Sequence, residues 1–320
     1  MSSYLVTGGA GFIGSNLVNY LRQSGHDVMA LDDLSNGHVE FLVDPSTLVV
    51  DDFASNTTLQ DIKNQEFDIV VHLAAIPRVS YSVEHPLETH DVNVTKTLAF
   101  IDACRGNISR FVFASSSSVY GGADILPTPE TAPRNPQSPY ALQKAVIEDY
   151  LRLYNHHYGL DSVALRFFNV FGPNQLGGSP YSIAISAWLT AILQGEQMRS
   201  DGDGSQSRDL CYVDNVVQAI ELAAIASDTL DADTFNVACG DRTTNSEILD
   251  ALKKRYPTAK SYDADWRPGD VMHTQADISK IERVLGYSEP IKFWTGLERT
   301  IEWYEKNAEL VNKLSSLTRM

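Results

Sequence analysis

The fold is decided by the segment Thr7-Gly8-Gly9-Ala10-Gly11-Phe12-Ile13-Gly14, which spaces three glycines as G-x-x-G-x-x-G. The segment follows a short apolar run, Tyr4–Thr7, that is typical of a β-strand, and it opens a helical pattern at Gly11–Ser24. Glycines at this spacing permit a tight turn and let a diphosphate approach the backbone at the helix N-terminus. The segment therefore predicts a strand–turn–helix unit that binds a dinucleotide.

Short β-branched runs and helical patterns continue to alternate through the first half of the chain, which predicts a parallel sheet with crossover helices. We expect further strands at Asp27–Asp32, Thr47–Val50, Asp68–Leu73, Arg110–Ala114 and Ser162–Phe167, and helices at Thr57–Lys63, Pro86–Cys104 and Pro139–Tyr158. Some of these strands are apolar throughout, as in a sheet that is covered on both faces. The predicted fold class is α/β, a Rossmann-type doubly wound parallel sheet.

After about Gly172, glycine-rich turns and scattered helices replace the regular alternation. We expect residues 1–171 to form the NAD-binding Rossmann domain and residues 172–320 to form mainly a smaller C-terminal, substrate-binding lobe. Segments near 206–217 and 234–238 are expected to return to the first domain as later strands.

Asp32 ends the second expected strand, about 20 residues after the glycines, where a carboxylate can accept hydrogen bonds from the adenine ribose. A carboxylate at this position repels a 2′-phosphate, and no Lys or Arg lies between Asp33 and Glu40 to bind one. The sequence therefore favours NAD over NADP. Asp52 and Phe53, after the third strand, are candidate adenine contacts, although an ordinary strand-end carboxylate beside a core aromatic ring explains them equally well.

Tyr140 and Lys144 lie four residues apart in an expected helix and therefore share one helix face. Ser138 can cap this helix and Pro139 can begin it, which places Tyr140 in the first turn. The helix N-terminus and the ammonium group both favour a phenolate, so we expect them to lower the pKa of Tyr140 from about 10 toward the working pH. Such a base could take a hydroxyl proton while a hydride leaves the same carbon.

A run of four serines, Ser115 to Ser118, closes the fifth expected strand. It stands at the carboxyl edge, where open α/β sheets bind their ligands. We expect these serines to line the site and to supply the hydrogen bond that the reacting oxygen requires.

Composition argues against several other classes of protein. The formal net charge is −16, whereas nucleic-acid backbones are held by basic surfaces. The three cysteines are widely spaced, so we expect neither a disulfide framework nor a metal site. The first strand starts without a basic leader, and the longest apolar stretch, near 183–193, is too short to span a bilayer. We expect a cytoplasmic protein with neither nucleic acid nor membrane as a partner.

Taken in order, these motifs resemble those of the extended short-chain dehydrogenase/reductase family. The resemblance extends over nearly the whole chain. Besides the glycine loop, it rests on the serine-rich strand end with Val119-Tyr120-Gly121, on Ser138-Pro139-Tyr140-x-x-x-Lys144, on Arg166-Phe167-Phe168-Asn169-Val170-Phe171-Gly172-Pro173, on Gly202-Asp203-Gly204 with Ser207-Arg208-Asp209, and on Arg267-Pro268-Gly269-Asp270. It implies an NAD-dependent enzyme that acts on a nucleotide-activated sugar.

The resemblance gives Ser116, Tyr140 and Lys144 the catalytic positions, with Ser116 bonded to the sugar O4. We expect cofactor contacts from Gly8, Gly11, Phe12, Ile13, Gly14, Asp32, Asn36, Asp52, Phe53, Leu73, Ala74, Ala75, Asn93, Ser115, Tyr140, Lys144 and Phe167. We expect substrate contacts from Ser116, Ser117, Ser118, Asn169, Arg208, Arg267, Asp270 and Thr274. Within the substrate set, the resemblance assigns the diphosphate to Asn169, Arg208 and Arg267, and the uridine ribose to Asp270.

Two positions indicate which member of the family the sequence resembles. Related 4,6-dehydratases carry Asp and Glu after the catalytic serine, whereas this chain carries Ser117 and Ser118, which cannot act as carboxylic acid or base. The sequence is similar instead to the 4-epimerases, which oxidise C4, let the 4-keto sugar rotate, and return the hydride to the other face. Thr274 stands where glucose-only epimerases often carry tyrosine, so an N-acetyl group should fit. The expected substrates are UDP-GlcNAc/UDP-GalNAc, with UDP-glucose/UDP-galactose also accepted.

Three alternatives stay open. Arg78 could recognise a carboxylated sugar, which would make the chain a UDP-glucuronate 4-epimerase. A second alternative is a lyase, either a dehydratase or a decarboxylase of sugar nucleotides. A third is a non-catalytic NAD-sensing protein on the same fold. The resemblance also implies a homodimer formed through the helices Pro86–Cys104 and Pro139–Tyr158, although their apolar faces could equally be buried within one monomer.

Overall fold

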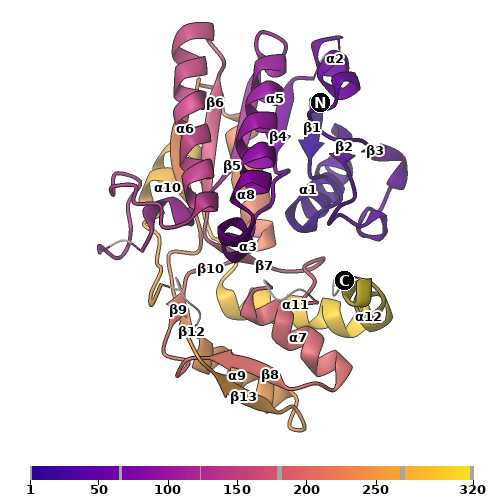
Figure 1. Ribbon diagram of the computed structural model, residues 1–320, viewed down its shortest axis with the longest axis vertical. Helices are drawn as coiled ribbons and strands as arrows, with labels where there is room; N and C mark the ends of the chain where they lie inside the picture. The colour runs from indigo at the N-terminus through magenta and orange to yellow at the C-terminus, as the bar shows by residue number, and fades with distance from the viewer. Residues whose placement is uncertain (1, 65–66, 123, 179–181, 267–270, 318–320) are drawn as a thin grey trace.

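A computed structural model of the chain describes residues 2–64, 67–122, 124–178, 182–266 and 271–317. Seven strands of this described part form one parallel sheet in the order β3-β2-β1-β4-β5-β6-β11 (Figure 1). Their bounds are β1 Ser3–Thr7, β2 Asp27–Asp32, β3 Leu48–Val50, β4 Ile69–His72, β5 Arg110–Ser116, β6 Ser162–Phe167 and β11 Asp233–Val237. The first six agree with the predicted strands to within two residues, and the predicted Rossmann-type fold class is confirmed.

Strand order reverses beside β1, because β1 pairs with β2 on one side and with β4 on the other. The chain therefore crosses over in opposite directions from this point, which opens a crevice at the carboxyl ends of β1 and β4. All of the predicted cofactor-binding motifs end at this edge of the sheet.

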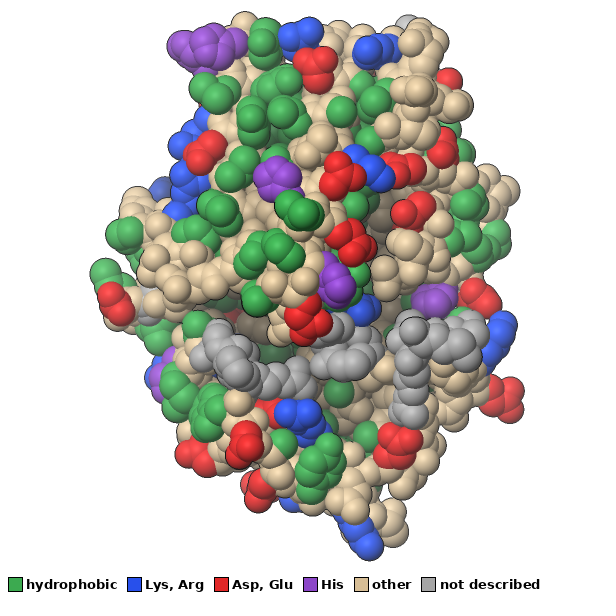
Figure 2. Space-filling view, viewed as in Figure 1, with side chains coloured by type: hydrophobic (Ala, Val, Ile, Leu, Met, Phe, Trp, Pro, Cys, Tyr) green, Lys and Arg blue, Asp and Glu red, His purple; other side chains and the backbone are tan. Residues whose placement is uncertain are grey.

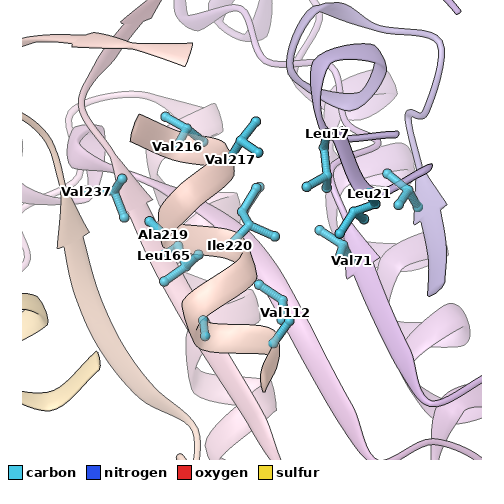
Figure 3. Close-up of a cluster of buried hydrophobic side chains, with 14 of the residues drawn as sticks. Leu17, Leu21, Val71, Val112, Leu165, Val216, Val217, Ala219, Ile220 and Val237 are labelled. Carbon is cyan, nitrogen blue, oxygen red and sulfur yellow. The ribbon is translucent and has the colours of Figure 1, made fainter. Parts of the chain in front are cut away.

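Helices cover both faces of the sheet (Figure 1). One face is covered by α1 (Phe12–Gln23), α8 (Val213–Ile225) and α10 (Ser279–Leu285), and the other by α2 (Asn56–Asn64), α5 (Thr97–Cys104) and α6 (Pro139–Tyr158). Figure 3 shows the first of these layers, in which Leu17 and Leu21 of α1 and Ile220 of α8 point toward Val112 and Val71 of the sheet. This two-sided burial explains why the central strands are apolar at successive positions.

The helix predicted at Pro86–Cys104 is divided into α4 (Pro86–His90), a π-helical segment η3 (Asp91–Lys96) and α5. Asn93 lies in this wide turn, where it is buried and hydrogen-bonded to the backbone of Ile76 and to Gln143. A short additional helix, α3 (Val79–Glu84), precedes α4. Single π-turns of this kind commonly mark functional regions.

A smaller lobe lies below the carboxyl edge of the sheet (Figure 1). It contains α7 (Ala184–Gln194), α9 (Asn245–Arg255), α11 (Phe293–Lys306) and α12 (Ala308–Leu317). Three two-stranded ladders accompany them: β7 (Asn169–Phe171) with β10 (Leu210–Tyr212), β8 (Met198–Asp201) with β13 (Ser261–Ala264), and β9 (Ser207–Arg208) with β12 (Thr243–Thr244). Single-turn helices are η1 (Val39–Phe41), η2 (Pro45–Thr47) and η4 (Ser117–Tyr120).

The segments near 206–217 and 234–238, both expected to return to the first domain, take different positions in the structure. As the sequence predicts, the segment near 234–238 joins the large sheet as β11. The segment near 206–217 forms β9 and β10, which pair outside the large sheet, and the start of helix α8, which packs against that sheet. β10 pairs with β7, whose residues 169–171 belong to the range expected for the first domain.

Within the described ranges, no helix has both the length and the apolar character that crossing a membrane requires.

Packing between α8 and the sheet can be tested at Ile220, which is fully buried. Ile220→Ala should lower the free energy of unfolding by about 2–5 kcal/mol, because it leaves a cavity against the central strands. Ile225→Ala makes the same chemical change at the end of the same helix, where the side chain is 54% exposed, and should cost less than about 0.5 kcal/mol. Urea denaturation of both variants measures the difference, and equal losses would contradict the assigned packing.

Candidate active site

A cavity of about 630 Å³ lies where the strand order reverses, at the carboxyl ends of β1, β2, β4 and β5. Figure 2 shows the surface hollowed between the sheet domain at the top and the smaller lobe at the bottom. Both parts contribute to the wall, since Gly8 and Asp32 come from the sheet domain and Gln175 and Ser186 from the lobe. The volume is within the range that holds cofactors and other small ligands.

The glycine loop forms one wall through contacts that only glycine permits. A Cβ at Gly14 would lie 2.0 Å from the carbonyl oxygen of Gly8, and a Cβ at Gly9 would lie 2.6 Å from Cβ of Ala30. Gly8 itself has a φ of +68°. Gly11 is the N-cap of α1 and supplies no side-chain cap, so the first N–H groups of the helix are left to bind an anion. This geometry fits the diphosphate of a dinucleotide.

Asp32 is held in place next to this loop. Its carboxylate accepts hydrogen bonds from the backbone N–H of Ala10 at 3.0 Å and of Leu34 at 2.8 Å. Burial raises the pKa of Asp32, and the backbone hydrogen bonds oppose that effect. The carboxylate therefore has fixed partners on the protein side and lines the cavity on the other, as a ribose acceptor requires.

Of the two residues predicted to contact adenine, Phe53 lines the cavity and Asp52 does not. Phe53 lines the cavity together with Asp51, whereas Asp52 is turned away and forms an ion pair with Lys96. Asn93, also predicted as a cofactor contact, does not line the cavity, because its amide is engaged with Ile76 and Gln143. Strand ends expose alternate side chains, so the sequence could not say which of the two neighbouring aspartates faces the ligand.

The remaining predicted cofactor residues lie together in the wall. They are Gly8, Gly11, Phe12, Ile13, Gly14, Asn36, Leu73, Ala74, Ala75, Ser115, Tyr140, Lys144 and Phe167. The wall also contains His38, Asn174, Gln175 and Ser186, which no sequence pattern indicated. Arg78 lines the cavity as well, and its guanidinium donates to the Asn36 side chain at 3.4 Å.

The predicted catalytic residues converge at one end of the cavity. Ser138 caps α6 by accepting from the N–H of Ala141 at 3.2 Å, and Pro139 is the first helical residue, as predicted. Tyr140 follows, and its own N–H donates to the Ser82 hydroxyl at 3.1 Å. One turn later, Lys144 donates to the carbonyl oxygen of Ala114 at 2.7 Å, which ties α6 to the end of β5.

The expected lowering of the Tyr140 pKa is not what the structure gives. Burial raises the pKa of Tyr140 to about 12, and its hydrogen bond with Ser116 lowers it only in part. Burial also lowers the pKa of Lys144 to about 7, against the attraction of Glu148. The ammonium lies 5.8 Å from the Tyr140 ring centroid and is bonded to Ala114 instead. The effect of desolvation on the pKa of Tyr140 is therefore larger than the effects of the Lys144 ammonium group and of the helix N-terminus.

Glu148 is a supporting residue that the sequence reasoning missed. Its carboxylate is buried and accepts from Ser115 at 2.6 Å and from Arg166 at 2.9 and 2.7 Å. Arg166 also donates to the hydroxyl of Tyr120 at 2.9 Å. Glu148 thus holds the serine-rich end of β5 in place through its bond to Ser115. The available signal was its spacing, because it stands four residues after Lys144 on the same helix face.

Of the predicted substrate residues outside the serine run, the structure describes Asn169, Arg208 and Thr274, and these three do not line the cavity wall. Asn169 lies in β7 and Arg208 in β9, where the Arg208 guanidinium donates to the carbonyl oxygens of Ser207 and Met272, both at 3.1 Å. The Thr274 hydroxyl accepts from the N–H of Asp209 at 3.3 Å. Ser116 lines the wall, whereas Ser117 and Ser118 do not. Arg267 and Asp270 fall outside the described residues.

Asp209 links the segments that contain Arg208 and Thr274 to the sheet domain. It is fully buried, and its carboxylate accepts from the backbone N–H groups of Cys239, Gly240 and Ala276 at 3.0 to 3.1 Å. Burial raises its pKa to about 7 although these hydrogen bonds oppose the shift. The segments that contain Arg208 and Thr274 are therefore fixed relative to the loop that follows β11.

Residues 4–238 match the NAD dependent epimerase/dehydratase family. The chain belongs to this family. The resemblance found in the sequence is thereby confirmed, and so is the expected dependence on NAD.

Curated relatives match the chain along almost its whole length. A putative UDP-glucose 4-epimerase of Methanocaldococcus jannaschii is 34% identical, over 95% of this chain and 98% of that protein. The UDP-glucose 4-epimerase of Mycolicibacterium smegmatis is also 34% identical, over 95% of this chain and 99% of that protein. A UDP-glucuronate 4-epimerase of Thermodesulfobacterium geofontis is 30% identical, over 98% and 99%. The expectation of a 4-epimerase therefore agrees with the names of these relatives.

Solved structures share the fold closely. The UDP-N-acetylglucosamine 4-epimerase of Methanobrevibacter ruminantium, in complex with UDP-N-acetylmuramic acid, is 36% identical with a TM-score of 0.88, covering 96% of this chain and 99% of its own. The UDP-glucose 4-epimerase of Thermotoga maritima, with UDP-glucose, gives 32% and 0.89, over 95% and 99%. A dTDP-glucose 4,6-dehydratase of Streptomyces venezuelae gives 29% and 0.88, over 98% and 99%. The fold is thus common to epimerases and dehydratases, and side chains must decide between them.

The residues of this family member fit NAD at the points where a dinucleotide is recognised. The glycine loop leaves room and N–H groups for a diphosphate, and Asp32 offers a ribose acceptor. A Cβ at Gly37 would lie 2.6 Å from the Asp32 carboxylate, so the loop after β2 packs directly onto that carboxylate. A 2′-phosphate would meet this negative charge, which agrees with NAD and not NADP.

Burial of Lys144 predicts a pH dependence of stability in the NAD-free protein. Its folded pKa of about 7 lies below its usual value, so the unfolded chain binds more protons between about pH 7 and 10. Lys144 therefore lowers stability most at and below neutral pH, and least near pH 10. Lys144→Met should stabilise the protein relative to wild type near pH 7, and this advantage should shrink as the pH rises. Urea denaturation at several pH values measures it, and a pH-independent difference would contradict the assigned burial.

Proposed function

We propose that this family member is a UDP-sugar 4-epimerase that acts best on UDP-GlcNAc and UDP-GalNAc and also accepts UDP-glucose and UDP-galactose. The observation that carries the proposal is the convergence of Ser116, Tyr140 and Lys144 at one end of the cavity. The positions that hold a carboxylic acid and base in 4,6-dehydratases are here Ser117 and Ser118. A 4-epimerase needs Ser116, Tyr140 and Lys144, but it does not need a carboxylic acid and base at positions 117 and 118.

The proposed reaction begins at the sugar 4-hydroxyl. Tyr140, as the phenolate, takes the hydroxyl proton, and the O–H electrons form the C4 carbonyl as the C4–H bond breaks. NAD, when bound, supplies reversible hydride acceptance for that bond. After the 4-keto sugar turns over, the hydride returns to the opposite face of C4 and Tyr140 gives its proton back to O4. Ser116 donates a hydrogen bond to O4 throughout, which stabilises charge as it develops.

The environment of Tyr140 suggests how the base is controlled. Burial keeps the phenol protonated, with its pKa raised to about 12. Positive charge brought close to a buried phenol favours its ionisation strongly, because the local dielectric is low. The positive nicotinamide ring of bound NAD and a protonated Lys144 would both supply such charge beside Tyr140. We infer that Tyr140 becomes a competent base only in the loaded enzyme, which would limit side reactions before the cofactor is present.

The lobe formed mainly by residues 172–320 is the part that we assign to the nucleotide of the substrate. Asn169, Arg208 and Arg267 are proposed to bind the diphosphate, and Asp270 the uridine ribose. Arg208 suits this role because a planar guanidinium can pair with two phosphate oxygens. Asp209, the neighbouring buried carboxylate, would fix the strand that presents it.

A neutral or N-acetylated sugar is favoured over a uronate by the position of Arg78. Its guanidinium is bonded to Asn36, four residues after the ribose acceptor Asp32, and so faces the cofactor end of the cavity. Thr274 supports the acetylated sugars because threonine is far smaller than tyrosine. The name of the Methanobrevibacter ruminantium structure, a UDP-N-acetylglucosamine 4-epimerase, agrees with this choice.

We also propose that the enzyme is a homodimer. Exposed apolar side chains gather on α3, α4 and α6, where Leu87 is 86%, Val83 61%, Leu142 53% and Leu153 51% exposed. Apolar groups in this number on neighbouring helices commonly mark a surface that another chain covers. A second copy of the same helices would bury them in an isologous interface.

Tyr140→Phe tests whether the site is catalytic. The variant keeps the backbone bond to Ser82 but loses the base, so kcat for interconversion of UDP-GlcNAc and UDP-GalNAc should fall by about 10²–10⁴-fold while bound NAD is unchanged. NMR of the products measures conversion, and mass spectrometry should show no change in substrate mass, unlike a lyase. Tyr20→Phe, at an exposed tyrosine bonded to Glu221, is the matched control. Full epimerase activity in Tyr140→Phe would rule out Tyr140 as the base. A wild-type protein that binds NAD, has no epimerase activity and keeps its biological role in the Tyr140→Phe variant would favour a non-catalytic NAD-sensing protein.

Thr274→Tyr tests the choice of sugar. If threonine leaves space for the N-acetyl group, tyrosine should reduce kcat/KM for the acetylated pair by about 10-fold or more and change that for UDP-glucose by less than about 3-fold. Initial rates on both pairs, taken side by side, give the ratio. Equal losses on the two pairs would mean that Thr274 does not shape the sugar pocket.

A further inference from the structure

Ser118 makes two hydrogen bonds to one atom, the hydroxyl oxygen of Ser116. Its backbone N–H donates at 3.2 Å, and its own hydroxyl donates at 2.9 Å. Ser116 lines the cavity, and its side chain lowers the pKa of Tyr140, whereas Ser118 is half-buried and does not line the wall. Ser118 thus contacts the predicted catalytic serine without lining the cavity itself.

The number of bonds at Ser116 has a chemical consequence. A serine hydroxyl has two lone pairs and one proton, so it can accept two hydrogen bonds and donate one. The two donors of Ser118 occupy both acceptor positions. The one remaining capacity of Ser116 is to donate its proton. Tyr140 also lines the cavity, and Ser116 lowers its pKa, as a donor to the phenolate would. Hydrogen bonds in such a chain also strengthen one another, which makes Ser116 a better donor.

Capping the turn alone does not require this second bond. Ser116 is the N-cap of η4, and a cap needs only the N–H of Ser118. The same double contact recurs at a surface turn, where Ser46 donates its N–H and hydroxyl to one oxygen of Asp44 at 3.1 and 2.6 Å. There the acceptor is the Asp44 carboxylate, which has further lone pairs available and carries no proton. At Ser116 the same contact fixes the direction of a proton.

We propose that Ser118 is a positioning residue that commits Ser116 to donating its proton, first to the Tyr140 phenolate and then to the sugar O4. The proposal rests on the proposed 4-epimerase function and extends it by one residue. Ser118 itself forms and breaks no covalent bond. Its effect is to stabilise the ionised form of Tyr140 and the oxygen that develops charge at C4.

Ser118→Ala removes the hydroxyl donor and keeps the backbone donor. We expect kcat on UDP-GlcNAc to fall by about 5- to 15-fold, which corresponds to the loss of one hydrogen bond, while KM and bound NAD stay within about 2-fold. The acidic limb of the pH–rate profile should move to higher pH, because a weaker donor at Ser116 leaves the Tyr140 phenolate less stable. Ser118→Thr keeps the hydroxyl and should restore both properties. Ser46→Ala removes the matching bond at the surface turn and should leave both unchanged.

A second readout does not depend on turnover. Ionisation of Tyr140 in the NAD-loaded protein can be followed as the ultraviolet difference between each protein and its Tyr140→Phe counterpart. Ser118→Ala should raise the pH at which this difference appears. If wild type proves inactive on UDP-sugars while this shift is present, the proposed function fails and the role of Ser118 stands. An unshifted ionisation, or a change in KM with kcat intact, would overturn the role of Ser118.

Discussion

The close approach of two glycines determines where everything else in the cavity can lie. The carbonyl of Gly8 reaches so near to Gly14 that any side chain there would collide with it at 2.0 Å. This contact brings the first turn of α1 against the end of β1, so that uncapped N–H groups face the crevice. An anion is the natural partner of such a helix end. The rest of the wall is arranged around that point.

The catalytic end of the cavity is held by a second set of contacts, made across α6. Tyr140, Lys144 and Glu148 recur every four residues and are all buried, which is costly for groups that carry charge. Glu148 is paired with Arg166 and with Ser115, and Lys144 is bonded to Ala114. These bonds join α6 to β5 and fix Ser116 beside Tyr140. Because burial raises one pKa and lowers the other, the charge states of the pair depend on what binds next to them.

The glycine-loop end and the α6 end of the cavity together explain why the family of this chain is easier to establish than its substrate. A 4,6-dehydratase and two 4-epimerases match this chain with similar TM-scores, because the sheet and the glycine loop serve all of them alike. We propose that the distinction lies in a few side chains at the end of β5 and in the lobe. By resemblance, Ser117 and Ser118 stand at the positions where 4,6-dehydratases carry carboxylates. The same fold can therefore carry different chemistry by local change.

The first six strands of the sheet, the glycine loop, Asp32 and the spacing of Tyr140 and Lys144 could all be predicted, because each depends on local periodicity or on spacing within one element. The three-dimensional packing was needed to establish that Asp51 and not Asp52 faces the cavity, that β10 stays outside the large sheet, and that Glu148 supports the serines. It also decided that burial outweighs the ammonium in setting the Tyr140 pKa. These outcomes depend on which side of a strand faces the ligand, which edge is already paired and how far water is excluded. All three are fixed by contacts between residues far apart in the chain.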